Sequence, residues 1–194
     1  MRKKLLSLSL FVLLVQGPLT VHPLFSQSRN ANEKTISDIF LKKSNIWEGP
    51  FQNYINRNGG ITQKGKIQIE IKYDGGQVVQ MRNKFLDERN KQSDYTGYAS
   101  MKILGNKLEY VGETSVDENT GNRIENHVFK GYILEKHLYI HEEYTEVFSE
   151  GKRENRKNTV HYLLLSDNEI LQAADVYVND GLMVFAYTIL KKKD

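Results

Sequence analysis

The sequence contains no cysteine. This absence excludes disulfides, thiol catalysis, thiolate metal sites and iron–sulfur clusters. Small secreted animal proteins usually contain disulfides, because their small cores gain stability from them. A chain of more than about 150 residues can bury roughly two-thirds of its surface without such bonds. A cysteine-free chain of 194 residues, if it is exported, therefore fits a bacterial protein best.

The motifs of several enzyme classes are also missing. The sequence has no G-x-S-x-G pentapeptide for a nucleophile elbow and no glycine-rich loop before a helix to hold phosphate. Gly59-Gly60 and Gly75-Gly76 fit turns instead. His137 and His141 would suit zinc on a helix, but on a strand, at about 3.4 Å per residue, they are too far apart to share a metal. We therefore expect no metal site, no cofactor and no standard catalytic machinery.

No apolar run is long enough to cross a bilayer as a helix, which takes about 20 residues. The run at residues 5–15 follows a basic start and precedes a polar tail, and these are the three parts of a secretory signal. Ser26 and Ser28 have the small-residue spacing that a signal peptidase requires, and no cysteine follows for a lipid anchor. We expect cleavage after Ser28, which gives a periplasmic or secreted protein with one domain at residues 29–194; an uncleaved anchor is the alternative.

Removal of residues 1–28 changes the charge balance. The full chain has 27 basic and 24 acidic residues, and the signal contains three basic residues and no acidic one, so 24 of each remain. With no net charge left, the composition gives no argument for a basic patch that would bind nucleic acid or an anionic membrane surface. The lysines at 191–193 fit a solvated end of the chain.

One short helix is predicted at residues 32–44. Ile36, Ile39 and Phe40 fall on one helical face, and Asn32 can cap the helix. From Trp47 onward the apolar period changes to two.

The alternation is clearest in KIQIEIKY at residues 66–73, and about ten such strands follow one another. Only residues 59–65 and 87–94 look like longer loops. Successive strands without crossover helices form an antiparallel meander, and closing the meander removes its edges. The predicted fold is all-β, an antiparallel up-and-down β-barrel of about eight to ten strands, with the helix closing one end or packing outside.

Turn lengths predict strand registers, because the apolar faces of paired strands must stay aligned. A three-residue loop at 74–76 and two-residue loops at 105–106 and 135–136 satisfy this condition. Further hairpins are expected at 117–121, 149–156, 166–169 and 179–181. The expected pairs are Tyr73–Gln77, Ile71–Val79 and Ile69–Met81, then Ile103–Leu108 and Met101–Tyr110, then Ile133–Leu138, Gly131–Ile140, Phe129–Glu142 and His127–Tyr144.

A helix followed by Trp47-Glu48-Gly49 and a meander of eight to ten strands resembles the calycin superfamily of lipocalins and fatty-acid-binding proteins. Lipocalins usually have glycine, one residue, then tryptophan. The reversed order here is nearer to the nitrobindin-like barrels, which bind haem through a histidine near the C-terminal end. No histidine follows His161, so haem is not expected. The resemblance implies a central cavity for a small, mostly apolar ligand.

The candidate site residues come from two hairpins. The register of the 135–136 turn places His127, Glu142 and Tyr144 on the inward face, as a satisfied internal network or as anchors for a ligand. The last hairpin is apolar on both faces, and its polar members Asp175 and Tyr187 are candidates to line a cavity. Its outer face needs cover, from the predicted helix or from a second copy of the chain in a homodimer.

Three alternative functions are consistent with these sequence patterns. The leading one is a non-enzymatic barrel that binds a small apolar or amphiphilic molecule in its interior. The alternative is a barrel with a solid core whose outer face binds protein, including a second copy of itself. The third, which lacks a catalytic motif, is an enzyme that uses His127 and Glu142 for acid–base chemistry.

Overall fold

A computed structural model describes residues 34–55, 60–87, 92–112 and 122–193. Residues 34–194 form one compact unit. The predicted signal at 1–28, the helix cap Asn32 and the hairpin at 117–121 lie outside the described residues.

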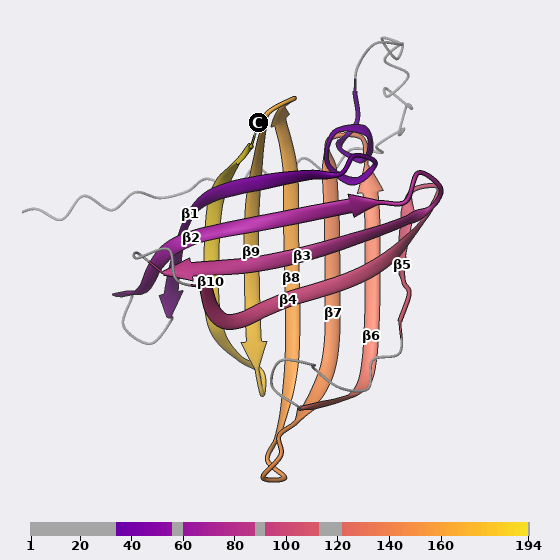
Figure 1. The fold of residues 1–194 in the computed structure, drawn as a ribbon. Helices are drawn as coiled ribbons and strands as arrows, with labels where there is room; N and C mark the ends of the chain where they lie inside the picture. The colour runs from indigo at the N-terminus through magenta and orange to yellow at the C-terminus, as the bar shows by residue number, and fades with distance from the viewer. Residues whose placement is uncertain (1–33, 56–59, 88–91, 113–121, 194) are drawn as a thin grey trace, which may run out of the picture. The chain divides into compact units, whose positions relative to one another are not determined.

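Ten antiparallel strands close into a barrel, as the sequence predicts. Each strand pairs with its neighbours in sequence, and the first strand pairs with the last. Figure 1 shows β1–β4 crossing in front of β6–β9 at a steep angle. The strands are β1 (Asn45–Ile55), β2 (Gly60–Tyr73), β3 (Val78–Asp87), β4 (Gln92–Leu104), β5 (Lys107–Tyr110), β6 (Arg123–Leu134), β7 (His137–Val147), β8 (Arg153–Ser166), β9 (Glu169–Val178) and β10 (Gly181–Lys192).

The helix η1 (Ser37–Leu41) is much shorter than the prediction for residues 32–44. The Lys42 N–H donates to Ser37 O, five residues back, so this single turn is a π-helix. Thr35 begins the turn as half of a capping box, because its hydroxyl accepts from the Asp38 N–H while the Asp38 carboxylate accepts from the Thr35 N–H. One turn is too short to be stable alone, so packing must hold it.

That packing closes one end of the barrel. The Ile36 N–H donates to Glu135 O in the β6–β7 turn at 2.7 Å. Phe40 is fully buried, with its ring 5.6 Å from that of Trp47 and 5.1 Å from that of Tyr162. The expected packing of this helix against the outside of the barrel is therefore wrong, and its closure of an end is confirmed. The same core contains the inward residues of most strands: Ile67, Ile69, Ile71, Val79, Met81, Met101, Ile103, Leu108, Ile133, Leu138, Ile140, Leu164, Ile170 and Leu190.

The two-residue turns predict their registers correctly near the turn. Ile103–Leu108, Met101–Tyr110, Ile133–Leu138, Gly131–Ile140 and Phe129–Glu142 all pair as expected. The loop after Tyr73 does not, because Tyr73 pairs with Val79 and Ile71 with Met81. The Asp74 carboxylate accepts from the N–H groups of Gly76 and Val78, which holds a longer loop than the one predicted. The shift is two residues, so the same side chains still face inward.

Two other boundaries differ from the prediction. Residues 60–65 belong to β2 and form no loop, since Gly65 pairs with Asp87 of β3. The residue at position 65 is glycine because a Cβ at this position would overlap the Leu86 carbonyl oxygen. The loop predicted at 87–94 is shorter, since β4 already begins at Gln92. Among the described residues, no helix is long and apolar enough to cross a membrane.

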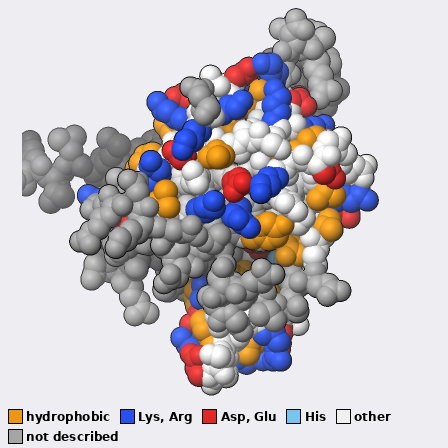
Figure 2. Space-filling view, in the orientation of Figure 1, with side chains coloured by type: hydrophobic (Ala, Val, Ile, Leu, Met, Phe, Trp, Pro, Cys, Tyr) orange, Lys and Arg blue, Asp and Glu red, His pale blue; other side chains and the backbone are white. Residues whose placement is uncertain are grey.

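Charges of both signs interleave on the face formed by β1–β4 (Figure 2). Glu70, for example, lies 3.4 Å from Lys72 and 3.5 Å from Lys84. These side chains point to solvent while their neighbours in sequence point to the core, which is the alternation seen in the sequence.

Candidate functional site

Three of the predicted site residues lie together inside the barrel. The His127 Nε2 atom is 3.6 Å from Glu142 Oε1, and the His127 ring centroid is 6.1 Å from that of Tyr144. Glu142 shares the inward face of β7 with buried Leu138 and Ile140. The expected proximity of these three residues is therefore confirmed.

A β-bulge modifies the predicted pairing at this point. Glu125 pairs with Thr145 and Val128 with Glu143, so Asn126 and His127 together lie opposite Tyr144. The prediction that His127 pairs one to one with Tyr144 is therefore wrong. Asn126 has φ of 55°, a left-handed conformation that asparagine tolerates better than most residues.

Aromatic rings surround the His127–Glu142 pair. The Tyr110 ring meets that of His127 edge-on at 4.8 Å, and Phe129 lies 5.9 Å from Tyr110. Neither Tyr110 nor Phe129 is among the predicted site residues. The sequence does predict inward positions for these two residues, since the registers of the 105–106 and 135–136 turns place both side chains on the inward faces of their strands.

The Glu142 carboxylate acts on the phenols inside the barrel. Burial raises the pKa of Tyr110, and the charge of Glu142 raises it further. Burial likewise raises the pKa of Tyr162, a hydrogen bond from Gln172 opposes that shift, and Glu142 adds to it. The negative charge of Glu142 thus affects the pKa of one phenol beside the site and of another in the core.

Solvent reaches this part of the interior. The Glu142 side chain is 25% exposed although it faces inward, whereas the side chains next to the helix are fully buried. Asn158 lies beside Glu142 across the β7–β8 ladder, and its Oδ1 atom is buried without a hydrogen-bond partner. An unpaired buried acceptor is costly, and such groups often mark a site for a ligand or water.

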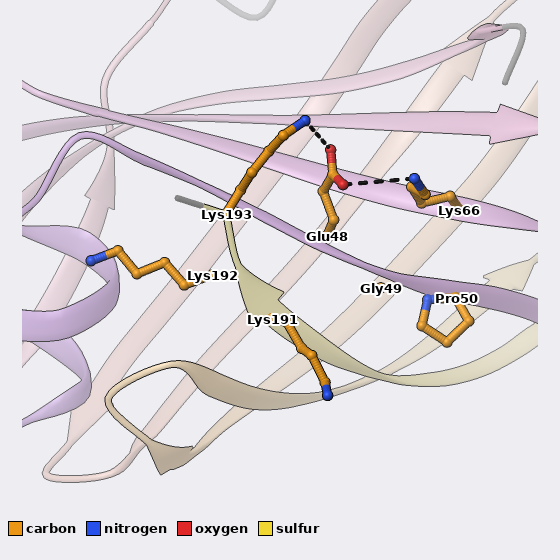
Figure 3. Close-up of a pocket in the computed structure, with 7 residues that line it drawn as sticks. All are labelled: Glu48, Gly49, Pro50, Lys66, Lys191, Lys192 and Lys193. Carbon is orange, nitrogen blue, oxygen red and sulfur yellow. Dashed lines mark hydrogen bonds and ion pairs between the residues drawn. The ribbon is translucent and has the colours of Figure 1, made fainter.

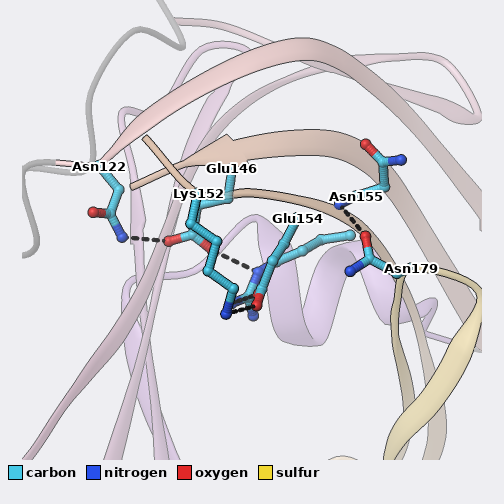
Figure 4. Close-up of polar contacts among 7 residues, drawn as sticks. Asn122, Glu146, Lys152, Glu154, Asn155 and Asn179 are labelled. Carbon is cyan, nitrogen blue, oxygen red and sulfur yellow. Dashed lines mark hydrogen bonds and ion pairs between the residues drawn. The ribbon is translucent and has the colours of Figure 1, made fainter. Parts of the chain in front are cut away.

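Beyond Tyr144, an ion-pair network follows the inward faces of β7 and β8 toward the end opposite the helix (Figure 4). Arg156 Nε lies 2.5 Å from Glu146 Oε2, and Arg156 Nη2 donates to Glu154 Oε2 at 2.9 Å. The Arg156 Nε–H is not aligned with Glu146, so that contact is an ion pair without a hydrogen bond. Lys152 also pairs with Glu154, and the Asn122 amide donates to Glu146. Each carboxylate of this network therefore has a cationic partner.

A second candidate is a surface hollow of about 360 Å³ near the end of β10 (Figure 3). It is lined by Glu48, Gly49, Pro50, Lys66, Lys191, Lys192 and Lys193. Burial disfavours ionisation of Glu48, but hydrogen bonds from Lys193 and Gln68 outweigh it and lower the pKa of this carboxyl group. Because Glu48 pairs with Lys66 and Lys193, and the lysines are largely exposed, this hollow is a weaker candidate than the interior.

The other two predicted residues do not reach the interior. Asp175 pairs with Thr159 and Tyr187 with Ala173, and both lie on the outward faces of β9 and β10. Tyr187 is 53% exposed. The expectation that they line a cavity is therefore wrong, because the alternation of these strands gives the inward positions to other residues, among them buried Gln172 and Thr188.

The other described histidines, His137, His141 and His161, occupy outward positions of β7 and β8, although His141 is buried. His137 and His161 stack with a 3.0 Å contact between Nε2 and Nδ1, and His141 contacts Thr159 and Glu143. Within the described part of the chain, no group of three His, Asp or Glu side chains could hold a metal ion.

Comparisons with known proteins find little similarity to this chain. No family model matches the sequence. No curated protein matches it either. Among solved structures, a protein of unknown function from the DUF3598 family of Nostoc punctiforme aligns with a TM-score of 0.42 and 10% identity, over 78% of this chain and 47% of that chain. A putative thioesterase II from Thermobifida fusca aligns with a TM-score of 0.24 and 8% identity, over 82% of each chain. The chain spans about half the length of the first of these, and both TM-scores are too low to support an argument about fold or function.

Proposed function

We propose that this protein is an exported, non-enzymatic barrel that binds a small amphiphilic molecule in the half of its interior opposite the helix. The observation that carries the proposal is the inward-facing Glu142, which keeps 25% of its side chain exposed inside a wall of aromatic rings. A charge that folding alone required would be more fully enclosed by partners. The rings of Tyr110, Phe129 and Tyr144 would contact the apolar part of the ligand, and Glu142 and His127 its polar part.

The two halves of the interior differ in a way that supports this placement. Phe40, Trp47 and Tyr162 fill the helix end, which leaves no room for a ligand there. Inward positions farther along β7 and β8 carry partly exposed polar side chains, namely Glu142, Tyr144, Glu146, Glu154, Arg156 and Asn158. A ligand would enter from that end.

Native mass spectrometry of protein purified from its own host tests this function directly. We expect an added mass that disappears on denaturation. Protein that carries no ligand, and that binds no amphiphile from a panel of single-chain lipids and amines, would refute the proposal.

Export is part of the same proposal and has its own test. N-terminal sequencing of protein recovered outside the cytoplasm should begin at Arg29, because the pattern at residues 1–28 predicts cleavage after Ser28. A sequence that begins at Met1 would contradict it.

A second candidate function rests on the outer apolar face, which we define as the outward side chains of β8–β10: Leu163, Leu165, Leu171, Ala173, Phe185, Tyr187 and Ile189. Five of them, Leu163, Leu165, Phe185, Tyr187 and Ile189, are 41–53% exposed. Two cross-strand rows on this side contain no Lys, Arg, Asp or Glu: Tyr139–His161–Ala173–Tyr187 and His137–Leu163–Leu171–Ile189.

The occupant that suits this face is a second copy of the chain. An uncharged patch can meet itself across a two-fold axis without repulsion between like charges. The Glu169–Lys191 pair at its border supplies both signs for a polar rim. This face and the interior site do not overlap, so dimerisation and ligand binding are compatible.

Sedimentation over a range of concentrations tests the dimer. Ile189→Lys should shift the equilibrium to monomer, whereas Val128→Lys, at an exposed position of β6 outside this face, should not. A wild-type protein that is monomeric at all concentrations would refute this second candidate.

A further inference from the structure

The interior site contains a negatively charged group, the Glu142 carboxylate. Among the residues that the structure describes, His127 is the only potential cation within 4 Å of the Glu142 carboxylate. The charge of Glu142 adds to the raised pKa of Tyr110 and of Tyr162, so this carboxylate acts on its surroundings inside the barrel. A ligand group with a positive charge, placed beside Glu142, would compensate that charge.

The cations of the neighbouring network are already engaged. Arg156 lies between Glu146 and Glu154, and Lys152 pairs with Glu154 at 2.7 Å. Two carboxylates and two cations balance there, so the network has no spare positive charge to offer Glu142.

The rings beside Glu142 favour the same kind of ligand. Tyr110, Phe129 and Tyr144 lie around His127, with centroid distances to its ring of 4.8, 6.5 and 6.1 Å. Aromatic faces attract organic cations through their quadrupoles, and more strongly where water is excluded. The same rings contact apolar groups well, so they suit a cation attached to a hydrocarbon body.

An acceptor without a hydrogen-bond partner lies next to Glu142 in the ladder. Asn158 pairs with Glu142 across the ladder, and in the assigned orientation of its amide the buried Oδ1 atom has no donor. A carboxylate and a carbonyl oxygen side by side call for a group with several N–H donors. A protonated amine has them, whereas a quaternary ammonium group has none.

We infer that the interior site selects protonated alkyl or aryl amines, with the ammonium group between Glu142 and Asn158 and the apolar body among the aromatic rings. This inference rests on the proposed function and adds to it the charge and donor character of the ligand.

Isothermal titration calorimetry with four probes of equal chain length tests the inference: octylamine, octyltrimethylammonium, octanol and octanoate. Octylamine should bind at least tenfold more tightly than octanol or octanoate. The affinity of octyltrimethylammonium should lie between those of octylamine and octanol, because it keeps the positive charge and the contact with the aromatic rings of the site but lacks N–H donors. Glu142→Gln should weaken octylamine at least tenfold and leave octanol unchanged.

Glu143→Gln is the matched control, because Glu143 is the next residue of β7 and faces outward to His141 and Lys157. It should leave all four affinities unchanged. Asn158→Ala should weaken octylamine more than octyltrimethylammonium. Thermal melting of each variant in the absence of ligand shows whether the fold is intact.

The outcomes separate this inference from the proposed function. Equal binding of all four probes, insensitive to Glu142→Gln, would leave a binding barrel but overturn its selectivity for amines. Tighter binding of octanoate would overturn it as well. If no probe binds but a ligand is retained from the host, the identity of that ligand decides, and a neutral or anionic ligand refutes the inference. If no probe binds and nothing is retained, the proposed function itself fails.

Discussion

Phe40→Ala tests whether the short helix is a plug on which the barrel depends. Phe40 is fully buried, with its ring centroid 5.6 Å from that of Trp47 and 5.1 Å from that of Tyr162. Truncation of a buried phenylalanine costs about 3–5 kcal/mol, and the strand walls here cannot easily collapse into the cavity. The two ring contacts add to the loss, since aromatic pairs contribute about 0.5–1.5 kcal/mol each beyond their buried area. We expect a loss in the upper part of that range, against a total stability of about 5–15 kcal/mol.

Urea unfolding, with the midpoint and slope compared between variants, measures this loss. Lys42→Ala in the next turn is the control and should change the free energy of unfolding by no more than about 0.5 kcal/mol, because Lys42 is exposed and only loosely paired with Asp38. A loss below about 1 kcal/mol for Phe40→Ala, or equal losses for both variants, would refute the packing of the helix inside the barrel end.

Three further predictions concern the barrel wall. Ile69→Asp should unfold the protein, whereas Gln80→Asp at an exposed position of β3 should cost no more than about 0.5 kcal/mol of stability. Gln68→Asp is a poorer control, because Gln68 donates a hydrogen bond to Glu48. Equal losses of melting temperature for Ile69→Asp and Gln80→Asp would mean that the assigned faces are wrong. Gly49→Ala should lower the melting temperature, because a Cβ there would lie 2.5 Å from a backbone carbonyl oxygen of β10, and an unchanged melting temperature would disprove that close approach. The pKa of Glu48 is lowered in the folded state, so its stabilising effect is complete above about pH 4.5 and is lost as the pH falls through the folded-state pKa. Glu48→Gln should therefore destabilise the protein more at pH 7 than at pH 3. An equal effect at both pH values would contradict the direction of this pKa shift.

The sequence predicts the strands well because burial acts on every second residue. In residues 66–73 each isoleucine is buried and each alternate polar residue faces outward, and this rule holds in one strand after another. Two-residue turns add the register, since Gly105 with positive φ permits a single tight geometry. These are local signals, so the strand count and most of the inward-facing residues follow from the sequence.

The sequence predicts contacts between distant segments less well. Ile36 and Phe40 show an amphipathic pattern, but the pattern does not say whether the apolar stripe meets the inside or the outside of the barrel. That choice depends on Trp47 and Tyr162, which lie on two strands far apart in sequence. The two apolar faces of the last hairpin posed the same problem, and the structure leaves its outer face exposed at Phe185, Tyr187 and Ile189.

The bulge at Asn126 explains why the predicted register fails where the site begins. With uninterrupted alternation, Arg123 and Glu125 would follow Phe129 and His127 onto the inward face. The extra residue reverses the faces, so Arg123 and Glu125 lie outside, where Glu125 pairs with Arg153 and with Arg123 at 2.6 Å.

The inward positions beyond the bulge then pass to Ile124 and Asn122. Ile124 pairs with Glu146 in the ladder, and the Asn122 amide donates to the Glu146 carboxylate at 2.7 Å. The phase change is visible in the sequence, because Ile124 is the one apolar residue between 122 and 127 and it breaks the odd-numbered series of inward residues on β6. The bulge at this asparagine with positive φ thereby moves Arg123 and Glu125 out of the wall, while His127 stays beside Glu142. Without that bulge Arg123 and Glu125 would both face the interior, so this one irregularity keeps a pair of opposite charges out of the barrel wall and gives Ile124 and Asn122 the inward positions.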